Sequence, residues 1–287
     1  MSRAVRSWLF APGHHARRVE KALTLNADVV VLDLEDACTP EDKPVARARI
    51  MESLSLPRTG RLFARINSMA SPYVWADLQA VIRPGLDGVM LPKIESGQEL
   101  KTLDWTLQQL ERERGLPVGG LEVMPLVETA TGLMALEEIA QASRRVRRLA
   151  FGAGDLTLDL SLQWTPEELE LLPYRSRMAL VSRAAGLEAP IDTVWMQVGD
   201  EAGMEASARR AHGLGFQGKL CIHPNQVACV HRAFAPTEAE VQRARQIVAA
   251  FAASDGACVL LDGQLVELPV VERAQRILAV AEAVVDR

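Results

Sequence analysis

Eight short apolar runs, separated by longer stretches with helical spacing, restrict the fold of this 287-residue chain more than any other feature. The runs are apolar on both faces and often contain β-branched residues, as strands buried on both sides do. They are SWLFAP (7–12), ADVVVLDLE (27–35), RLFARI (61–66), DGVMLPKI (87–94), LEVMPLV (121–127), RRLAFGA (147–153), DTVWMQV (192–198) and GKLCIHP (218–224). Strands that alternate with helices form parallel sheets with right-handed crossovers. Eight such units predict an α/β protein with a closed (β/α)₈ TIM barrel.

The competing architecture is a doubly wound open sheet. Such a sheet usually carries a glycine-rich phosphate-binding turn after its first strand, whereas this chain has Pro12-Gly13-His14-His15 there. The barrel is therefore favoured, and we place it in residues 1–235. Its predicted helices are 16–25, 45–54, 74–81, 98–114, 133–142, 167–185 and 202–214.

From about residue 236 the alternation of strands and helices stops. Thr237, followed by Glu240 three residues later, predicts the start of a helix. Two short apolar runs flank Asp262-Gly263, a pair typical of β-hairpin turns, and Pro269 suits the first turn of a final helix. Residues 236–287 exceed what one barrel needs, so we predict a C-terminal arm that is either a lid or an arm exchanged between subunits.

Charge and composition exclude several classes of partner. The chain has 32 basic and 37 acidic side chains, a net charge of −5, and lacks the basic stripe expected of a nucleic-acid-binding protein. No window approaches the ~20 apolar residues of a membrane helix, and the first residues do not resemble a secretory signal. The four cysteines, at 38, 221, 229 and 258, form no CxxC pair. We expect a cytoplasmic protein with reduced thiols and with neither a nucleic-acid nor a membrane partner.

Polar side chains follow the ends of seven of the eight runs, where the loops of a (β/α)₈ barrel build its active site. Glu128 and Asp155 follow adjacent runs, so their carboxylates are expected to converge. A pair of carboxylates that leaves positions for water and substrate oxygens suits Mg²⁺. The alternative is that each carboxylate caps the helix that follows it.

Arg65, at the end of the third run, has apolar neighbours and would be costly to bury without an anion. A guanidinium in this position can hold a substrate carboxylate through two parallel hydrogen bonds. The alternative is an internal ion pair with Asp33, Glu35 or Asp36, one strand away. Lys93, at the end of the fourth run, has the same two interpretations.

The histidines form no metal-binding motif. His14 and His15 follow the first run and His223 precedes Pro224, and no HExxH spacing occurs. We interpret them as loop groups, or as groups that support the site without touching substrate. The GxSxG motif is also absent, so a serine hydrolase is not supported.

Seven segments, taken in order, make the chain resemble the HpcH/HpaI aldolase and citrate lyase family, and within it the citrate lyase beta-chain and malyl-CoA or citramalyl-CoA lyase branch. They are RSWLFAPG, VVLDLEDACTPEDK, RLFARIN, VMLPKIES, PLVETATG, FGAGDLTLDL and KLCIHPNQV. The resemblance implies a (β/α)₈ barrel, a bound Mg²⁺ and a thioester substrate of the CoA type. It also implies a homo-oligomer, a trimer or a hexamer.

The same resemblance assigns roles to single residues. Glu128 and Asp155 match the Mg²⁺ ligands, and Arg65 matches the arginine that holds the 2-oxo-acid portion of the substrate. Glu35 and Asp36 match an acidic pair near the metal. The residues expected to contact substrate are Arg65, Glu128, Glu35, Lys93 and Lys43, the last in the region where contacts with CoA are expected.

The C-terminal arm resembles the segment that covers a neighbouring subunit's active site. There the acyl-CoA branch of the family often shows the pattern G-x-M-[IV]-D-x-P with a catalytic aspartate. This chain reads Gly263-Gln264-Leu265-Val266-Glu267-Leu268-Pro269, so Glu267 replaces the aspartate. If the arm accommodates the longer side chain, Glu267 is the proton-transfer group. If it does not, Glu267 is a surface residue paired with an arginine such as Arg273.

The implied reaction is the Mg²⁺-dependent cleavage, or formation, of a 3-hydroxy-3-carboxyacyl thioester of the malyl, citramalyl or citryl type, carried on CoA or on an acyl carrier protein. Its products are an acyl thioester and a 2-oxo acid. Arg65 would neutralise the substrate carboxylate, and Glu267 or Asp36 would move protons. Two alternatives stay open. One is an aldolase that acts on free hydroxy-oxo acids without CoA, and the other is a non-catalytic subunit of a citrate-lyase-like complex.

Overall fold

Eight parallel strands close into a barrel in the computed structural model, which confirms the predicted (β/α)₈ architecture. Each strand pairs with the next along the chain, and the last pairs with the first. The strands are β1 (Ser7–Pro12), β2 (Val29–Asp33), β3 (Arg61–Arg65), β4 (Gly88–Leu91), β5 (Glu122–Val127), β6 (Ala150–Phe151), β7 (Ile191–Asp192) and β8 (Gly218–Cys221).

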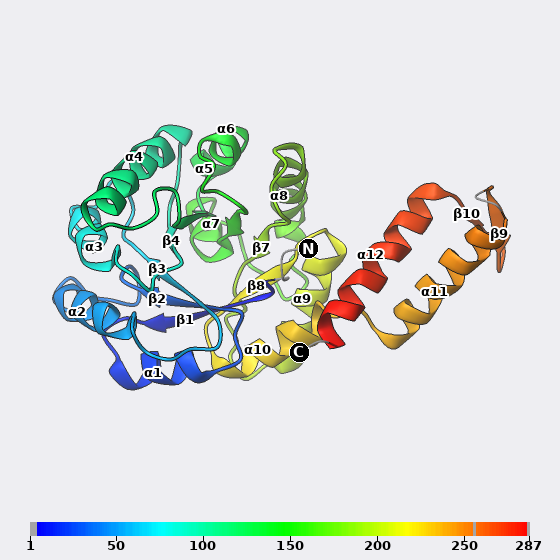
Figure 1. Ribbon diagram of the computed structural model, residues 1–287, viewed down its shortest axis with the longest axis horizontal. Helices are drawn as coiled ribbons and strands as arrows, with labels where there is room; N and C mark the ends of the chain where they lie inside the picture. Colours follow the sequence, from blue (N-terminus) through cyan, green and yellow to red (C-terminus); the bar gives the residue numbers. More distant parts are fainter. Residues whose placement is uncertain (1–4, 255–256, 286–287) are drawn as a thin grey trace. The chain divides into compact units, whose positions relative to one another are not determined.

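Helices surround the strands (Figure 1). They are α1 (Ala16–Thr24), α2 (Lys43–Ser53), α3 (Val74–Val81), α4 (Gly97–Glu113), α5 (Ala130–Met134), α6 (Leu136–Gln141), α7 (Ala153–Asp159), the 3₁₀ turn η1 (Leu169–Leu171), α8 (Leu172–Ala184), α9 (Glu201–Gly213) and α10 (Pro224–Ala233). The helices α2, α3, α4 and α9 occupy the stretches that helical spacing predicts, to within two residues at each end. Because helices cover the sheet, its strands are buried on both faces, which explains why their sequences read as continuous apolar runs.

Large apolar side chains fill the interior of the barrel. Trp8 and Phe63 meet edge to face at 5.0 Å between ring centroids, and both are fully buried. Valine, methionine and leucine side chains from the other strands complete this cluster. The interior is therefore a packed core rather than a channel, and the loops at the strand ends are left to build the site.

Two strands differ from their predicted runs. β7 covers only Ile191–Asp192, and the following residues form a loop in which Met196 is 60% exposed. The apolar character of that run belongs to a loop at the barrel mouth, not to a strand. β6 is equally short, and α7 starts directly after Gly152, so Asp155 lies in the first turn of a helix.

The structure describes residues 5–254 and 257–285, and these divide into two compact units. The barrel unit is Val5–His231, and the second unit begins at Arg232, slightly before the border proposed at residue 235. In the described ranges, no helix combines the length and the apolar character that crossing a bilayer requires.

The second unit consists of two helices and a hairpin, as the sequence predicts. They are α11 (Glu238–Ala253), β9 (Val259–Leu261), β10 (Gln264–Val266) and α12 (Leu268–Val285). Thr237 and Glu240 form the predicted capping box of α11. The hairpin turns at Asp262 and Gly263, whose φ angles of 53° and 77° fit the tight turn that joins β9 and β10.

Candidate active site

A cavity of about 790 Å³ lies at the carboxyl ends of the barrel strands. Four of the predicted site residues line it, and its remaining wall is largely apolar, with Phe10, Leu126, Val194 and Met196 among its residues. The four are Asp36, Arg65, Glu128 and Asp155. This is the end of the barrel at which (β/α)₈ enzymes carry their chemistry.

Glu128 is held in place by the backbone around it. It follows β5 directly, is 3% exposed, and its Oε1 accepts a 2.9 Å hydrogen bond from the backbone N–H of Lys93. Lys93 has a φ of 50°, a left-handed conformation that is uncommon for a residue with a side chain. A Cβ atom on Gly152 would lie 2.5 Å from Glu128 Oε2, so the carboxylate needs a glycine beside it.

Neither carboxylate of the predicted metal pair serves as a helix N-cap. The cap of α5 is Thr129, whose side chain accepts a hydrogen bond from the N–H of Gly132, and the cap position of α7 is Gly152. Asp155 lies in the first turn of α7 and its side chain is 34% exposed. Both carboxylates are therefore available to the cavity, which removes the capping alternative for Glu128.

Arg65 forms the internal ion pairs that were the alternative to substrate binding. Its Nε and Nη2 donate to the two oxygens of Asp33 at 2.7 and 2.5 Å. Its Nη1 lies 3.0 Å from Glu35 Oε2 and 3.5 Å from Asp36 Oδ2. The side chain of Asp36 is 55% exposed, so Nη1 is the edge of the guanidinium that a substrate carboxylate can reach.

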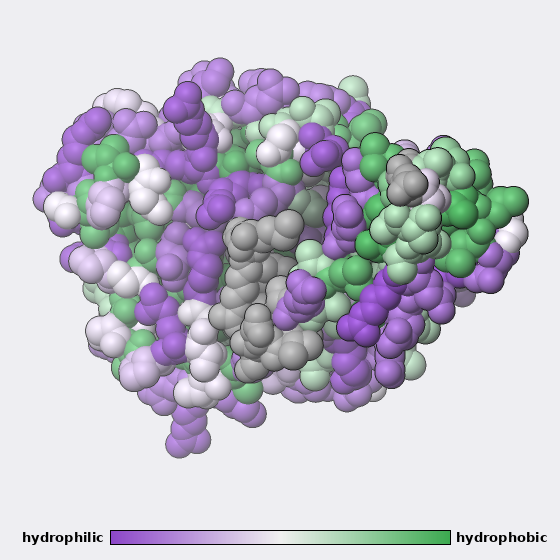
Figure 2. Space-filling view, turned by 45° about the vertical axis from the view of Figure 1, so that its right-hand side comes forward, coloured by the Kyte–Doolittle hydropathy of each residue, from purple (hydrophilic) through white to green (hydrophobic). Residues whose placement is uncertain are grey.

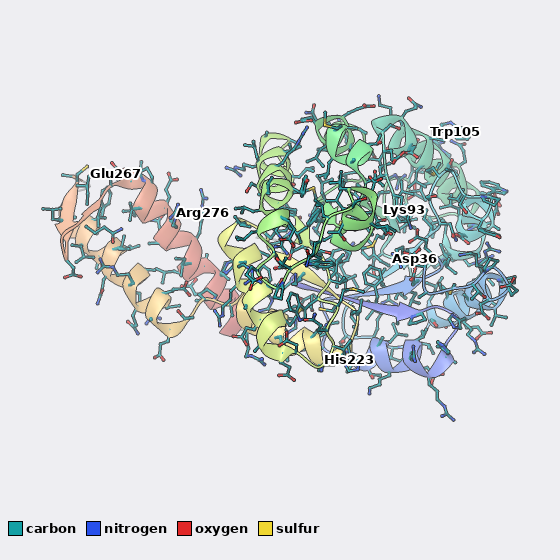
Figure 3. All side chains as sticks on the ribbon, turned by 180° about the vertical axis from the view of Figure 1, so that it is seen from behind. Asp36, Lys93, Trp105, His223, Glu267 and Arg276 are labelled. Carbon is teal, nitrogen blue, oxygen red and sulfur yellow. The ribbon has the colours of Figure 1, made fainter. Side chains whose placement is uncertain are left out.

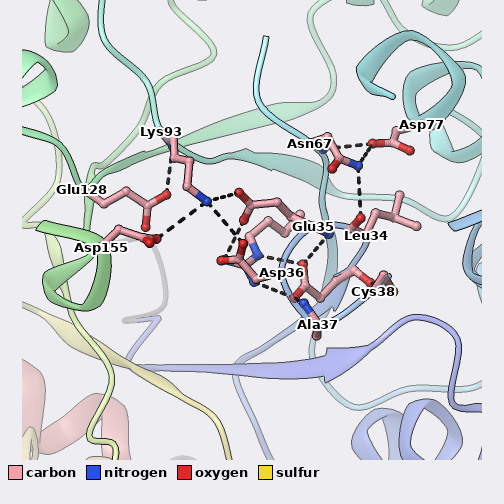
Figure 4. Close-up of polar contacts among 12 residues, drawn as sticks. Leu34, Glu35, Asp36, Ala37, Cys38, Asn67, Asp77, Lys93, Glu128 and Asp155 are labelled. Atoms are coloured by element: carbon pink, nitrogen blue, oxygen red, sulfur yellow. Dashed lines mark hydrogen bonds and ion pairs between the residues drawn. The ribbon is translucent and has the colours of Figure 1, made fainter. Parts of the chain in front are cut away.

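Lys93 links the two halves of the acidic cluster. Its ammonium contacts Glu35, lies 3.3 Å from Asp36 Oδ1, and lies 3.8 Å from Asp155 Oδ2 (Figure 4). Figure 3 labels Lys93 and Asp36, which both belong to the barrel unit. The structure thus gathers Glu35, Asp36, Lys93 and Asp155 around one point next to the cavity.

The cluster carries more negative than positive side chains. Asp33, Glu35, Asp36, Glu128 and Asp155 face two cations, Arg65 and Lys93. Burial raises the pKa of Glu128 well above its usual value, and the nearby carboxylates add to this effect against the influence of Arg65. Burial likewise raises the pKa of Glu35.

An added divalent cation fits this excess of negative charge. It would favour the ionised form of Glu128, which burial disfavours in the protein alone. No group of three or more His, Cys, Asp or Glu side chains forms a metal-binding cluster in the described part of the chain. Two carboxylates with water and substrate oxygens are the donor set that Mg²⁺ commonly uses, so Glu128 and Asp155 fit that ion.

Lys43 is not among the residues that line the cavity. The residue is 5% exposed, and Nζ donates to the carbonyl oxygens of Leu34 and Glu35 at 2.7 and 3.2 Å and to Asn67 Oδ1 at 2.9 Å. Such a satisfied, buried ammonium stabilises the loop after β2 that carries Glu35. A contact between Lys43 and the substrate stays a prediction.

Glu267 lies in the second unit, between β10 and α12, and its side chain is exposed. Its carbonyl oxygen accepts hydrogen bonds from the N–H groups of Val270 and Val271, which fixes its backbone at the start of α12. Within the described residues, no ion pair joins Glu267 to Arg273, the pairing predicted if Glu267 had no catalytic role. Its role in catalysis stays a prediction.

Three residues at the cavity that carry a charge were not among those predicted to form the site. Asp33 was considered only as a partner of Arg65, Arg18 and Lys21 from α1 were not singled out, and all three line the cavity. A signal for the last two exists in the sequence, because positions three apart on a helix lie on one face. That the face borders the cavity follows only from the packing of α1 against the barrel.

The chain matches one known protein family over most of the barrel. Residues 6–224 fit the model of HpcH/HpaI aldolase/citrate lyase. The chain is 36% identical to a citrate lyase subunit beta from Leuconostoc mesenteroides subsp. cremoris over 283 residues, which are 97% of this chain and 93% of the relative. It is 32% identical over 308 residues to an L-malyl-CoA/beta-methylmalyl-CoA lyase from Cereibacter sphaeroides, covering 99% of this chain and 96% of the relative.

A solved structure shows the same similarity in three dimensions. Protein CitE from Mycobacterium tuberculosis, in complex with magnesium, acetoacetate and coenzyme A, is 30% identical to this chain and has a TM-score of 0.82. The match covers 97% of this chain and 98% of that one. The similarity therefore includes residues after the barrel as well as the barrel itself.

Proposed function

Because the chain belongs to the HpcH/HpaI aldolase/citrate lyase family, we propose that it is a Mg²⁺-dependent carbon–carbon lyase. The substrate would be a 3-hydroxy-3-carboxyacyl thioester of the malyl, citramalyl or citryl type. Cleavage would give an acyl thioester and a 2-oxo acid, and the same site could catalyse the reverse condensation. Its relatives are named as a citrate lyase subunit and a malyl-CoA lyase, which supports this class of reaction.

The observation that carries the proposal is the placement of Glu128. Its carboxylate is almost fully buried, is held by the backbone N–H of Lys93, and lies in an acidic cluster with too few cations to balance it. A buried carboxylate in such surroundings is costly unless it meets a cation. Glu128 and Asp155 would hold Mg²⁺, which when bound supplies a Lewis acid for the oxygens of the oxo acid.

The other residues of the cluster would bind and orient the substrate. Arg65 would direct Nη1 at the substrate carboxylate, while Asp33 keeps the guanidinium in a fixed plane through its two hydrogen bonds. Burial raises the pKa of Glu35 above its usual value. The ammonium of Lys93, which contacts the Glu35 carboxylate directly, acts to lower that pKa. Asp36, half exposed at the edge of the cluster, would move aside when the carboxylate arrives.

Two cations on α1 support a thioester rather than a free acid as substrate. Arg18 and Lys21 line the same cavity and are exposed. The phosphates that CoA and the phosphopantetheine arm of an acyl carrier protein share would find positive charge there. The apolar wall that includes Val194 and Met196 suits the uncharged part of such an arm.

The second unit supports the proposal of a homo-oligomer in which the arm covers a neighbouring subunit's site. Leu260, Leu265 and Leu268 are 70%, 53% and 59% exposed, and hydrophobic side chains are visible on the surface of the arm in Figure 2. Exposed leucines that gather on one small unit are typical of a surface that packs against a partner. The arm would bring Glu267 to that partner's cavity. We further propose a cytoplasmic location, where the four free thiols would stay reduced.

The test is a substrate screen with the purified chain. Malyl-, citramalyl- and citryl-CoA would be incubated with Mg²⁺, and the released oxo acid would be measured. Cleavage of one thioester, lost on chelation of the metal and absent with the corresponding free acid, would support the proposal. Cleavage of the free hydroxy-oxo acid would favour the aldolase. Inactivity together with co-purification of an acyl carrier protein and a transferase subunit would favour the non-catalytic subunit.

A further inference from the structure

We propose that two hydrogen bonds, one at each end of the short helix α7, fix the direction of the Asp155 carboxylate and make the metal site selective for Mg²⁺ over Ca²⁺. Thr193 accepts the first of these bonds and Asp159 accepts the second. Neither is a proposed metal ligand, so both are positioning residues. The inference rests on the proposed Mg²⁺ site and adds the contacts that determine which ion the site binds.

The carboxylate of Asp155 depends on its helix for its direction. Within the described residues it accepts no hydrogen bond, and the cation that it approaches is Lys93, whose Nζ is 3.8 Å from Oδ2 (Figure 4). Glu128, by contrast, is held directly by the backbone N–H of Lys93. Because α7 has only 7 residues, much of its backbone lies in a first turn whose N–H groups have no partner inside the helix. Contacts with neighbouring elements therefore decide where Asp155 points.

At its first residue, α7 is joined to the loop after β7. The backbone N–H of Ala153 donates to Oγ1 of Thr193 at 2.8 Å, and the two residues are 40 positions apart in the sequence. Ala153 is fully buried and Thr193 is 1% exposed, so this bond is shielded from solvent. Gly152, at the cap position of α7, has no side chain that accepts a hydrogen bond. Without the Thr193 hydroxyl, the Ala153 N–H would be buried and unpaired, which is costly.

At its last residue, α7 is joined to the segment that follows the other proposed ligand. The carboxylate of Asp159 accepts a 2.8 Å hydrogen bond from the N–H of Ala130, the first residue of α5, which comes shortly after Glu128. Just before α7, the N–H of Gly152 donates to the carbonyl oxygen of Val127 at 3.0 Å. The helix that carries Asp155 is thus joined to the chain on both sides of Glu128, which fixes the position of one carboxylate relative to the other.

The two ions differ in how much they require of their ligands. Mg²⁺ demands a near-ideal octahedron with oxygens at about 2.0 to 2.1 Å, whereas Ca²⁺ accepts oxygens at about 2.3 to 2.6 Å in flexible arrangements. A carboxylate held in one direction suits Mg²⁺, and a carboxylate that is free to turn suits Ca²⁺. Loosening α7 should therefore weaken the binding of Mg²⁺ more than that of Ca²⁺. A general loss of structure would weaken the binding of both ions.

The experiment compares Thr193→Val, which keeps the shape of the side chain but removes the acceptor, with Thr193→Ser, which keeps the acceptor. Binding of Mg²⁺ and of Ca²⁺ to the full chain, with pyruvate present, would be measured by calorimetry. Losing a contact that orients a metal ligand typically lowers metal affinity about 10- to 100-fold, so the Mg²⁺ Kd of Thr193→Val should rise at least about tenfold. Its Ca²⁺ Kd should rise less than about threefold, because Ca²⁺ tolerates a mobile ligand. Thr193→Ser should bind both ions as the wild type does.

The matched control is Thr157→Val, the same chemical change on the same helix. The hydroxyl of Thr157 donates to the carbonyl oxygen of Gly154 at 2.9 Å, a bond that stays inside α7, so this variant should keep the wild-type Mg²⁺ Kd. Asp159→Ala tests the other end of the helix at an exposed position, where folding is not at risk. Its Mg²⁺ Kd should rise about threefold, since an exposed hydrogen bond contributes less than a buried one. Asp159→Asn, which keeps an acceptor oxygen, should bind Mg²⁺ as the wild type does.

Wild-type Mg²⁺ binding by Thr193→Val would overturn the inference, and so would an equal weakening of both ions or the same loss in Thr157→Val. If Thr193→Val does not fold, an unchanged ratio of the two Kd values in Asp159→Ala would overturn it. These outcomes leave the proposed function intact as long as the wild type binds Mg²⁺ and Glu128→Gln does not. A wild type that binds no Mg²⁺ in the presence of pyruvate would reject the proposed metal site, and the inference with it.

Discussion

The backbone N–H of Lys93 donates a 2.9 Å hydrogen bond to the carboxylate of Glu128, and this bond depends on a left-handed backbone conformation, φ 50°, at Lys93. Strained conformations of this kind are stable only where the surrounding structure imposes them. Here the result is a buried carboxylate with a fixed direction, next to the ammonium of Lys93, which is 3.8 Å from Asp155. The predictions below concern this carboxylate and the groups around it.

The affinity for Mg²⁺ should increase with pH. Burial raises the pKa of Glu128 well above its usual value, so the metal-free protein keeps a proton there at a pH where an ordinary carboxyl is ionised. Mg²⁺ must displace this proton, and its binding should tighten as pH rises and level off above the raised pKa. Calorimetric titrations from about pH 5 to about pH 9, in two buffers with different ionisation enthalpies, would count the proton released. A pH-independent Kd without proton release would contradict this prediction.

Gly152→Ala should remove most Mg²⁺ binding without unfolding the barrel. The new Cβ would lie 2.5 Å from Glu128 Oε2 and 2.6 Å from its Cβ, so the carboxylate has to turn away. Gly154→Ala is the matched control, because nothing lies within 4 Å of a Cβ there. We expect at least a tenfold weaker Kd for the first variant and an unchanged Kd for the second, with similar circular dichroism spectra. Equal affinities would show that Glu128 is not a ligand.

Arg65→Lys should lower kcat/KM at least tenfold. Lysine keeps the charge but cannot donate to both oxygens of Asp33 while offering a further N–H to substrate. Losing a charged hydrogen-bond partner in a water-poor site costs roughly 2 to 5 kcal/mol. Steady-state kinetics on the thioester found in the screen would measure the effect. Near-wild-type kinetics would limit Arg65 to its ion pair with Asp33.

Glu267→Gln should abolish turnover while ligand binding and the oligomer stay intact. Its backbone is fixed at the start of α12, which suits a catalytic group once the arm covers a neighbouring cavity. Glutamate is one methylene longer than the aspartate that the family resemblance implies at this position, and a misplacement of ~1 Å can lower a rate about a hundredfold. Lyase assays, pyruvate binding and light scattering would be compared. Full activity would reject the role and direct attention to Asp36 and Glu35.

Lys219→Met should destabilise the barrel strongly, although Lys219 does not line the cavity. Its Nζ lies 2.5 Å from Asp192 Oδ2, Arg175 Nε lies 2.8 Å from Asp192 Oδ1, and all three side chains are at most 1% exposed. Removing one partner of a buried ion pair typically costs about 3 to 5 kcal/mol. In Lys219→Met the buried carboxylate of Asp192 keeps Arg175 but loses the second cation that neutralises it. Arg209→Ala, which removes an exposed pair with Glu205, should cost less than about 1 kcal/mol. Urea unfolding followed by circular dichroism would compare the two.

Much of the fold was predictable because local sequence and strand burial point to the same structure. Continuous apolar runs identify strands covered on both faces, and the capping box at Thr237 and the turn at Asp262 and Gly263 are local signals that the structure confirms. The apolar run at 192–198 was predicted to be a strand, but most of it is a loop. A loop that lines a cavity can be as apolar as a strand. In this loop Trp195 is buried and the next residue, Met196, is exposed, as neighbouring residues in a strand can be. The spacing of apolar residues alone therefore cannot distinguish the loop from a strand.

The sequence by itself determined which side chains gather at the barrel mouth, since all parallel strands end there and Arg65, Glu128 and Asp155 follow three of them. The tertiary structure alone decided how those side chains are paired. Asp33 orients Arg65 from the neighbouring strand, and the buried ammonium of Lys43 donates a hydrogen bond to Asn67. Such contacts join residues that are more than twenty positions apart, and whether a charge meets a partner, a substrate or water depends on burial that no local pattern records.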